Sequence, residues 1–141
     1  MKKFVALLLL IAVMVPTIAF ATTPRTFGTF SFTSTGKNDT EDTETRAKGD
    51  SEFKWYITLE SASLLSANNC SSSNILGVRP RILSNGESAG SYVKIKSLVT
   101  GQGYRYNNND VTQGTEIFLR MKKDDSSTTT ETLLVKGRFV P

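Results

Sequence analysis

The sequence predicts an all-β protein built as a small antiparallel β-sandwich, and three observations predict it. Apolar and polar residues alternate with a period of two in several segments, which is typical of strands with one buried and one solvated face. Sequences rich in Gly, Asn, Asp and Ser separate these segments. No segment after residue 21 has helical spacing. A small β-barrel is the alternative, because alternation does not show whether a sheet closes on itself.

The clearest strand is residues 53–60, in which four apolar side chains share one face and polar or amphipathic ones share the other. Residues 43–48 predict a polar edge strand, whose charges discourage pairing with another chain. Other strands are predicted around Phe30 and Phe32 and at residues 76–82, 92–96, 116–122 and 133–139. Turns are predicted at residues 84–86, 101–103, 107–110 and 124–127.

The first 21 residues have the three parts of a secretory signal peptide. Lys2 and Lys3 precede an unbroken apolar run at residues 4–15, and Ala19-Phe20-Ala21 offers small side chains at the cleavage site. The run is shorter than the roughly 20 residues that a membrane-spanning helix needs. The sequence therefore predicts cleavage after Ala21 and one secreted domain at residues 22–141, with no transmembrane segment. Sec-type export would place it outside the cell, or in the periplasm of a diderm.

The chemistry available to the chain is narrow, because it contains no histidine and one cysteine. Ser-His-Asp and Cys-His nucleophiles and His-containing zinc sites are therefore excluded. Cys70 has no second cysteine for an internal disulfide and lies in a polar stretch that is typical of a loop. No phosphate-binding loop or dinucleotide motif is present. We expect no catalytic residue, no metal and no cofactor.

Carboxylate pairs are the remaining route to catalysis. Asp39 with Glu41, or Asp124 with Glu131, would serve a hydrolase that acts on cell-wall or polysaccharide substrates. An EF-hand loop that begins at Asp39 would need glycine at its sixth position, where the chain has Glu44. A solvated acidic loop is therefore the favoured interpretation of residues 39–44.

Cationic pairs spaced by two residues recur in four predicted strands. This spacing places both charges of a pair on one strand face, opposite the core. If the strands are neighbours, the pairs form a basic face that would suit an anionic cell-surface polymer or lipid headgroups. Ordinary solvated charge on the wet face of a sheet is the alternative interpretation. The residues are Arg79, Arg81, Lys94, Lys96, Arg120, Lys122, Lys136 and Arg138.

Three short segments carry a resemblance to a known group. They are SNILGVR at residues 73–79, GTEIFLR at 114–120 and GRFVP at 137–141. Together with the signal peptide, they resemble small secreted β-proteins of Gram-positive bacteria, some of which are similar to lactococcin-type bacteriocins. The resemblance implies a Sec-exported bacterial protein with a compact sandwich, and it carries over no site residue.

The sequence thus predicts a secreted, non-catalytic binding or surface-interaction module. The rival classes are a bacteriocin-like secreted toxin and the carboxylate-dependent hydrolase described above. We expect no nucleic-acid partner.

Overall fold

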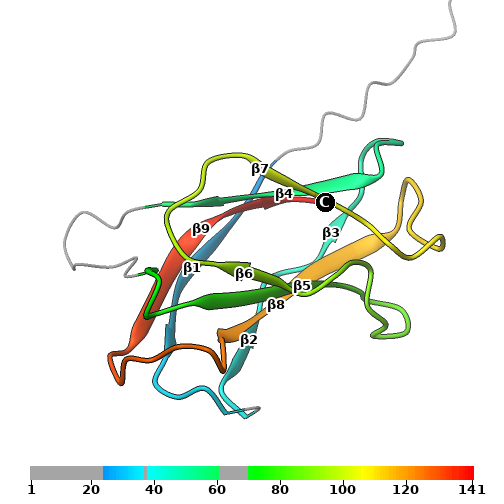
Figure 1. The fold of residues 1–141 in the computed structure, drawn as a ribbon. Coiled ribbons are helices and arrows are strands. Elements are labelled where there is room, and N and C mark those ends of the chain that lie inside the picture. Colours follow the sequence, from blue (N-terminus) through cyan, green and yellow to red (C-terminus); the bar gives the residue numbers. More distant parts are fainter. Residues whose placement is uncertain (1–23, 37, 61–69) are drawn as a thin grey trace, which may run out of the picture.

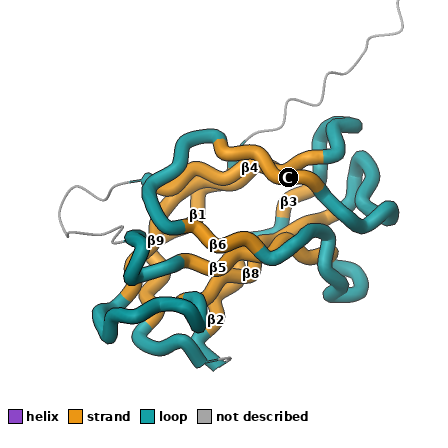
Figure 2. Tube along the Cα trace, in the orientation of Figure 1, coloured by secondary structure: helices purple, strands orange, loops and turns teal. Residues whose placement is uncertain are grey.

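The computed structural model describes residues 24–36, 38–60 and 70–141. The predicted signal peptide lies outside these residues. The described chain forms strands and no helix, which confirms the all-β prediction (Figures 1 and 2). The strands are β1 (Arg25–Phe32), β2 (Thr40–Asp42), β3 (Arg46–Ala47), β4 (Lys54–Leu59), β5 (Leu76–Ile82), β6 (Val93–Ile95), β7 (Gln102–Arg105), β8 (Glu116–Lys123) and β9 (Leu133–Val140).

The first sheet, which we call sheet A, has the strand order β1-β9-β4-β7. Its pairs are antiparallel, and β9 lies between β1 and β4 (Figure 1). The first described strand therefore pairs with the last one, with Arg25 opposite Phe139. A register shift between Phe27 and Phe30 marks a β-bulge in β1, which is an edge strand of this sheet.

The second sheet, sheet B, has the order β2-β8-β5-β6, and β3 also pairs with β8. The long strands β5 and β8 form its centre, with Val78 opposite Met121 and Arg79 opposite Arg120. Alternation along these strands is regular. Val78 and Pro80 are buried, whereas Arg79 and Arg81 are partly exposed.

The core lies between the two sheets, which are not joined into a closed barrel. Sheet A contributes Trp55, Ile57 and Phe139, and sheet B contributes Leu119 and Met121; all five are fully buried. Each such side chain stabilises the fold by about 1.5–3 kcal/mol relative to exposure. One continuous cluster includes these residues, so the sandwich prediction is confirmed and the barrel alternative is not.

Two details differ from the sequence prediction. Residues 101–103 were expected to be a turn only, but Gly101, with a φ of 56°, makes the turn and Gln102 begins β7. Gly103 is required by close approach rather than by a turn, since an added Cβ would lie 2.7 Å from the Tyr56 ring. Within the expected edge strand at 43–48, only β3 at residues 46–47 is a strand; β2 precedes it at residues 40–42, and the intervening Thr43 is buried.

None of the described residues belongs to a helix with the length and apolar character that crossing a membrane requires.

Candidate anion-binding face

The outer face of sheet B collects cations from neighbouring strands. On β8, Ile117, Leu119 and Met121 point into the core, so the alternate residues Arg120 and Lys122 face outward. Arg79 and Arg81 of β5 face the same way. Since β5 and β8 are paired, Arg79 lies directly opposite Arg120. Like charges in this position destabilise a sheet unless something compensates them.

These cations line a hollow of about 560 Å³ on the basic face. Its volume is within the range of about 300–1,000 Å³ that is common for ligand sites. Four of the lining side chains are cationic and one is a carboxylate. The lining residues are Thr40, Arg79, Arg81, Tyr92, Arg120, Met121, Lys122 and Asp125.

Arg120 is held by an acidic partner on one side and by a ring on the other. Its Nε and Nη2 donate to the two carboxylate oxygens of Asp42, at 2.8 and 2.6 Å. Asp42 is on the neighbouring strand β2, directly opposite Arg120. The guanidinium also lies over the Phe118 ring, 5.7 Å from its centroid. The hydrogen bond to Asp42 raises the pKa of Arg120 above its already high ordinary value.

Arg79 has an aromatic partner and no acidic one. Its guanidinium lies over the Tyr92 ring, 5.4 Å from the centroid. No described residue forms an ion pair with it, and its Nε is buried without a hydrogen-bond partner. By contrast, Arg81 donates from Nη1 to the carbonyl oxygen of Gly86 at 2.7 Å. Among the described residues, Arg79 and Arg81 both lack a carboxylate partner, and Arg79 also lacks a hydrogen bond to a carbonyl oxygen such as the one that Arg81 forms.

Tyr92 is fixed in place from two sides. Its ring lies over Gly77 of β5, where any Cβ would lie 1.6 Å from the Tyr92 hydroxyl oxygen. The hydroxyl donates to Asp124 Oδ2 at 2.8 Å. Burial, followed by this hydrogen bond, raises the pKa of Tyr92 above its ordinary value. The sequence pattern placed Tyr92 on an outward register but gave no sign of its role under Arg79.

Asp124 anchors the loop that follows β8. Burial on its own raises the pKa of the carboxyl group, but hydrogen bonds from Ser126, Tyr92 and Lys94 outweigh that effect and lower it to about 2. Lys94 Nζ lies 3.0 Å from Asp124 Oδ1 and 2.6 Å from Ser126 Oγ. Lys94 of β6 is thus on the basic face but is already neutralised.

Lys122 and Lys123 are adjacent in sequence but have opposite surroundings. Lys122 Nζ contacts both oxygens of Asp125, at 2.9 and 2.8 Å, and this carboxylate is 72% exposed. Lys123 points inward and is 1% exposed. Its ammonium donates to the carbonyl oxygens of Thr129 and Glu131, at 2.8 and 2.5 Å. Lys123 therefore helps to position the loop after β8, from which Asp125 borders the hollow.

The prediction of one face with all eight cations is wrong for its last pair. Lys136 and Arg138 are on β9 of sheet A, whereas the other strands belong to sheet B. Arg138 Nε lies 2.7 Å from Glu60 Oε1. Alternation shows which residues share a strand face, but it does not show which sheet a strand joins. Lys96 is exposed and directly follows β6.

In each carboxylate pair proposed for a hydrolase, the aspartate has a structural task. Asp39 Oδ2 accepts the backbone N–H groups of Thr33 and Ser34, at 2.7 and 2.8 Å. Asp124 is buried and bonded as described above. Within residues 24–36, 38–60 and 70–141, no three His, Cys, Asp or Glu side chains converge on a possible metal position.

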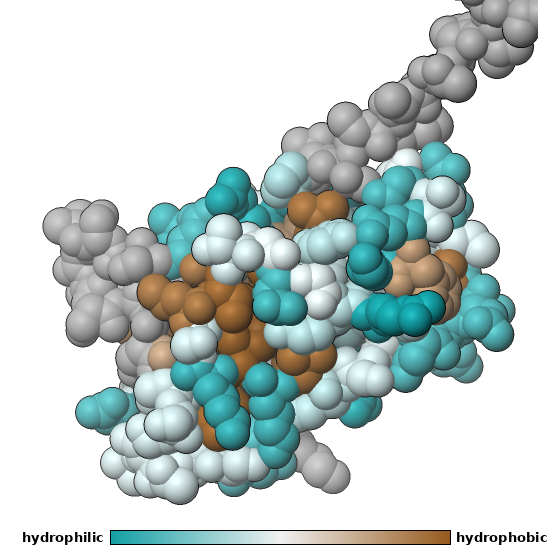
Figure 3. All heavy atoms as spheres, turned by 45° about the horizontal axis from the view of Figure 1, so that its top comes forward, coloured by the Kyte–Doolittle hydropathy of each residue, from teal (hydrophilic) through white to brown (hydrophobic). Residues whose placement is uncertain are grey.

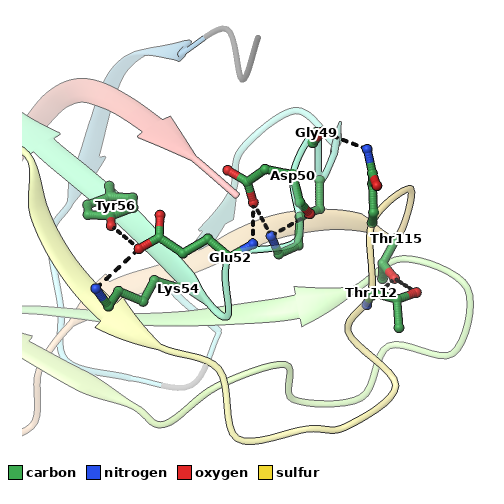
Figure 4. Close-up of polar contacts among 9 residues, drawn as sticks. Gly49, Asp50, Glu52, Lys54, Tyr56, Thr112 and Thr115 are labelled. Carbon is green, nitrogen blue, oxygen red and sulfur yellow. Dashed lines mark hydrogen bonds and ion pairs between the residues drawn. The ribbon is translucent and has the colours of Figure 1, made fainter. Parts of the chain in front are cut away.

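A second polar cluster, at the β3–β4 connection, resembles a site but is internally satisfied (Figure 4). The ammonium of Lys48 is buried and contacts both the carboxylate and the carbonyl oxygen of Asp50. Glu52 accepts hydrogen bonds from the Tyr56 hydroxyl, at 2.8 Å, and from Lys54. These contacts tie a loop together and pair its four charges with one another.

Cys70 is packed against the core, although the sequence pattern is typical of a loop. Burial raises the pKa of the Cys70 thiol to about 11, so the nucleophilic thiolate is scarce at neutral pH.

Comparisons with known protein families, curated proteins and solved structures found no match to this chain. The likeness to small secreted β-proteins of Gram-positive bacteria stays a prediction.

Proposed function

We propose that this chain is an exported, non-catalytic binding module that holds an anionic cell-surface polymer on the outer face of sheet B. The carrying observation is the opposed pair Arg79 and Arg120, in which Arg120 is paired with Asp42 and Arg79 has no carboxylate partner among the described residues. Such a pair reduces the stability of the sheet, and a bound anion would offset this effect. The predicted signal peptide supports export, and the resemblance favours a Gram-positive source.

The charge of the hollow supports an anionic ligand. Four cations and the Asp125 carboxylate line it, and Asp42 neutralises Arg120 from the side. Four cations against two carboxylates leave the hollow with a net charge of two positive charges. A groove with an excess of one charge attracts polymers of the opposite charge and accelerates their association.

Binding is favoured over the hydrolase and the toxin. The hydrolase needs two carboxylates free to exchange protons across a cleft, whereas Asp39 and Asp124 are bound to backbone or side-chain donors. The toxin interpretation depends on the resemblance alone, and no described contact adds to it.

The test measures binding to two soluble polyanions, sodium polyphosphate and poly-L-glutamate. Replacing Arg79 and Arg120 with Gln should weaken binding to at least one of them roughly tenfold or more, since bonds to charged groups contribute about 1.5–3 kcal/mol each. Binding should also fall steeply with salt, because the Debye length shrinks from about 10 Å at 0.1 M to about 3 Å at 1 M.

The matched control is Lys136→Gln with Arg138→Gln, which removes the same charge from the outer face of sheet A. This control should bind like the natural protein. Equal losses in both double variants would show a general effect of net charge and would contradict a site on sheet B.

A further inference from the structure

We propose that Arg79 and Arg120 form a clamp for one tetrahedral phosphate group, so that the ligand is a phosphate-bearing polymer. This inference rests on the proposed function and specifies its ligand class. The carrying observation is that both guanidinium groups are held over aromatic rings at directly opposed positions of two paired strands.

The clamp is preorganised on both sides. Arg79 lies over Tyr92, which is itself fixed by Gly77 and by its hydrogen bond to Asp124. Arg120 lies over Phe118, which is 8% exposed. Side chains that are already ordered lose less conformational entropy when a ligand binds. Arginine also suits this task better than lysine, because its planar fork matches phosphate oxygens in pairs.

Both arginines retain donors for a ligand. Arg120 commits Nε and one hydrogen of Nη2 to Asp42, and this leaves the second hydrogen of Nη2 and both hydrogens of Nη1. Arg79 forms no ion pair with any described residue, and although its Nε is buried, its two Nη groups remain as donors for a ligand. The donors thus come from two forks on neighbouring strands rather than from one.

This arrangement favours phosphate over carboxylate. A carboxylate is planar and its two oxygens are matched by a single fork, as Asp42 already shows on Arg120. A phosphate group has oxygens directed to several sides, so it can accept from both arginines at once. Its volume is much smaller than the hollow of about 560 Å³, which leaves room for the polymer on either side of the group.

Neither nucleic acid nor a membrane fits this face as well. Single-stranded nucleic acids bind through bases stacked on free aromatic rings, but guanidinium groups already cover Tyr92 and Phe118. Membrane-surface binding inserts apolar side chains. Leu83 and Leu98, both about half exposed, do not line the hollow. On the face shown in Figure 3, apolar side chains form separate patches between hydrophilic ones.

The test compares polyphosphate with poly-L-glutamate of similar total charge, on the full mature chain. The natural protein should bind polyphosphate roughly tenfold or more tightly than poly-L-glutamate. Arg79→Lys and Arg120→Lys keep the charge but lose the fork, so each should reduce this preference several-fold. Arg138→Lys, on the other sheet, is the control and should preserve it.

The outcomes separate this inference from the proposed function. Equal affinity for both polymers, unchanged in the lysine variants, overturns the phosphate clamp but leaves a polyanion-binding face. Absence of binding to either polymer overturns both. Equally tight binding to vesicles that contain phosphatidylglycerol would reassign the phosphate from a polymer to lipid headgroups and would contradict the proposed source.

Discussion

Asp124 shows how one buried carboxylate organises a surface. It is 2% exposed, yet it accepts hydrogen bonds from Tyr92 and Ser126 and contacts Lys94. These three residues come from two different connections and one strand of sheet B. A side chain that would be costly to bury alone thereby fixes the aromatic support of Arg79.

The pKa of Asp124 predicts an acid-sensitive contribution to stability. The folded pKa of about 2 is below the ordinary value of 3.8, so the contribution is fully present above about pH 4 and is lost as the pH falls through about 2. Its size is up to about 2 kcal/mol. Asp124→Asn should therefore lower the free energy of unfolding at neutral pH, and its difference from the natural protein should shrink between pH 4 and 2.

Chemical denaturation at several pH values measures this effect. Asp125→Asn removes a neighbouring but mostly exposed carboxylate, so this variant should still lose stability as the pH falls from 4 to 2. If Asp124→Asn loses as much stability between pH 4 and 2 as the natural protein does, other carboxylates are responsible for that loss.

The sequence predicted individual residues well wherever alternation governs them. Trp55, Ile57 and Leu59 are buried as the pattern indicates. The partners of the cations were not predictable, because Asp42 meets Arg120 across 78 residues of chain. Such contacts depend on strand order, and no local pattern encodes it.

At the scale of elements, β9 depends on a glycine where three strands meet. An added Cβ at Gly137 would lie 2.1 Å from the carbonyl oxygen of Thr58 on β4 and 2.9 Å from the Phe27 ring on β1. Register places Gly137 opposite both Leu59 and Phe27. The backbone of β4 cannot yield without separating from β9, so this residue must have no side chain.

Gly137→Ala should lower the free energy of unfolding by about 1–3 kcal/mol or more, because the added methyl group overpacks the junction. Gly28→Ala is the matched control, since an added Cβ there meets nothing within 4 Å. It should be neutral or stabilising by about 0.4–1 kcal/mol through the unfolded state. Urea denaturation of both variants checks this, and equal losses would contradict the proposed crowding at Gly137.

Some elements were missed for a related reason. The segment at 101–103 has two glycines and is typical of a turn, but β7 begins inside it because Tyr56 covers Gly103. The sequence shows the glycines but not the ring that one of them accommodates. The strand at 54–59 was predictable because its pattern needs no knowledge of a partner.

At the scale of the whole molecule, the sandwich is held together by strand pairs whose members are distant in sequence. The first described strand, β1, hydrogen-bonds to β9, and so does β4. Removing residues 133–141 would therefore leave β1 without its partner and expose one wall of the core.

A chain that ends at Thr132 should show no cooperative unfolding transition and no protection from proteases. A chain that lacks residues 22–32 is the comparison, because it loses an edge strand and leaves β9 paired with β4. It should retain a weaker but cooperative transition. A folded core in the chain that ends at Thr132 would contradict the central role of β9.

The late position of β9 also sets the timing of folding during synthesis. The complete sheet A cannot assemble while the ribosome still holds residues 133–140, because β1 and β4 pair with β9 and not with each other. Until β9 is available, sheet A of the emerging chain therefore stays incomplete, whereas sheet B does not contain β9. For a polypeptide that passes through a Sec channel in extended form, as we propose for this one, a sheet that needs its last strand would favour transport before folding.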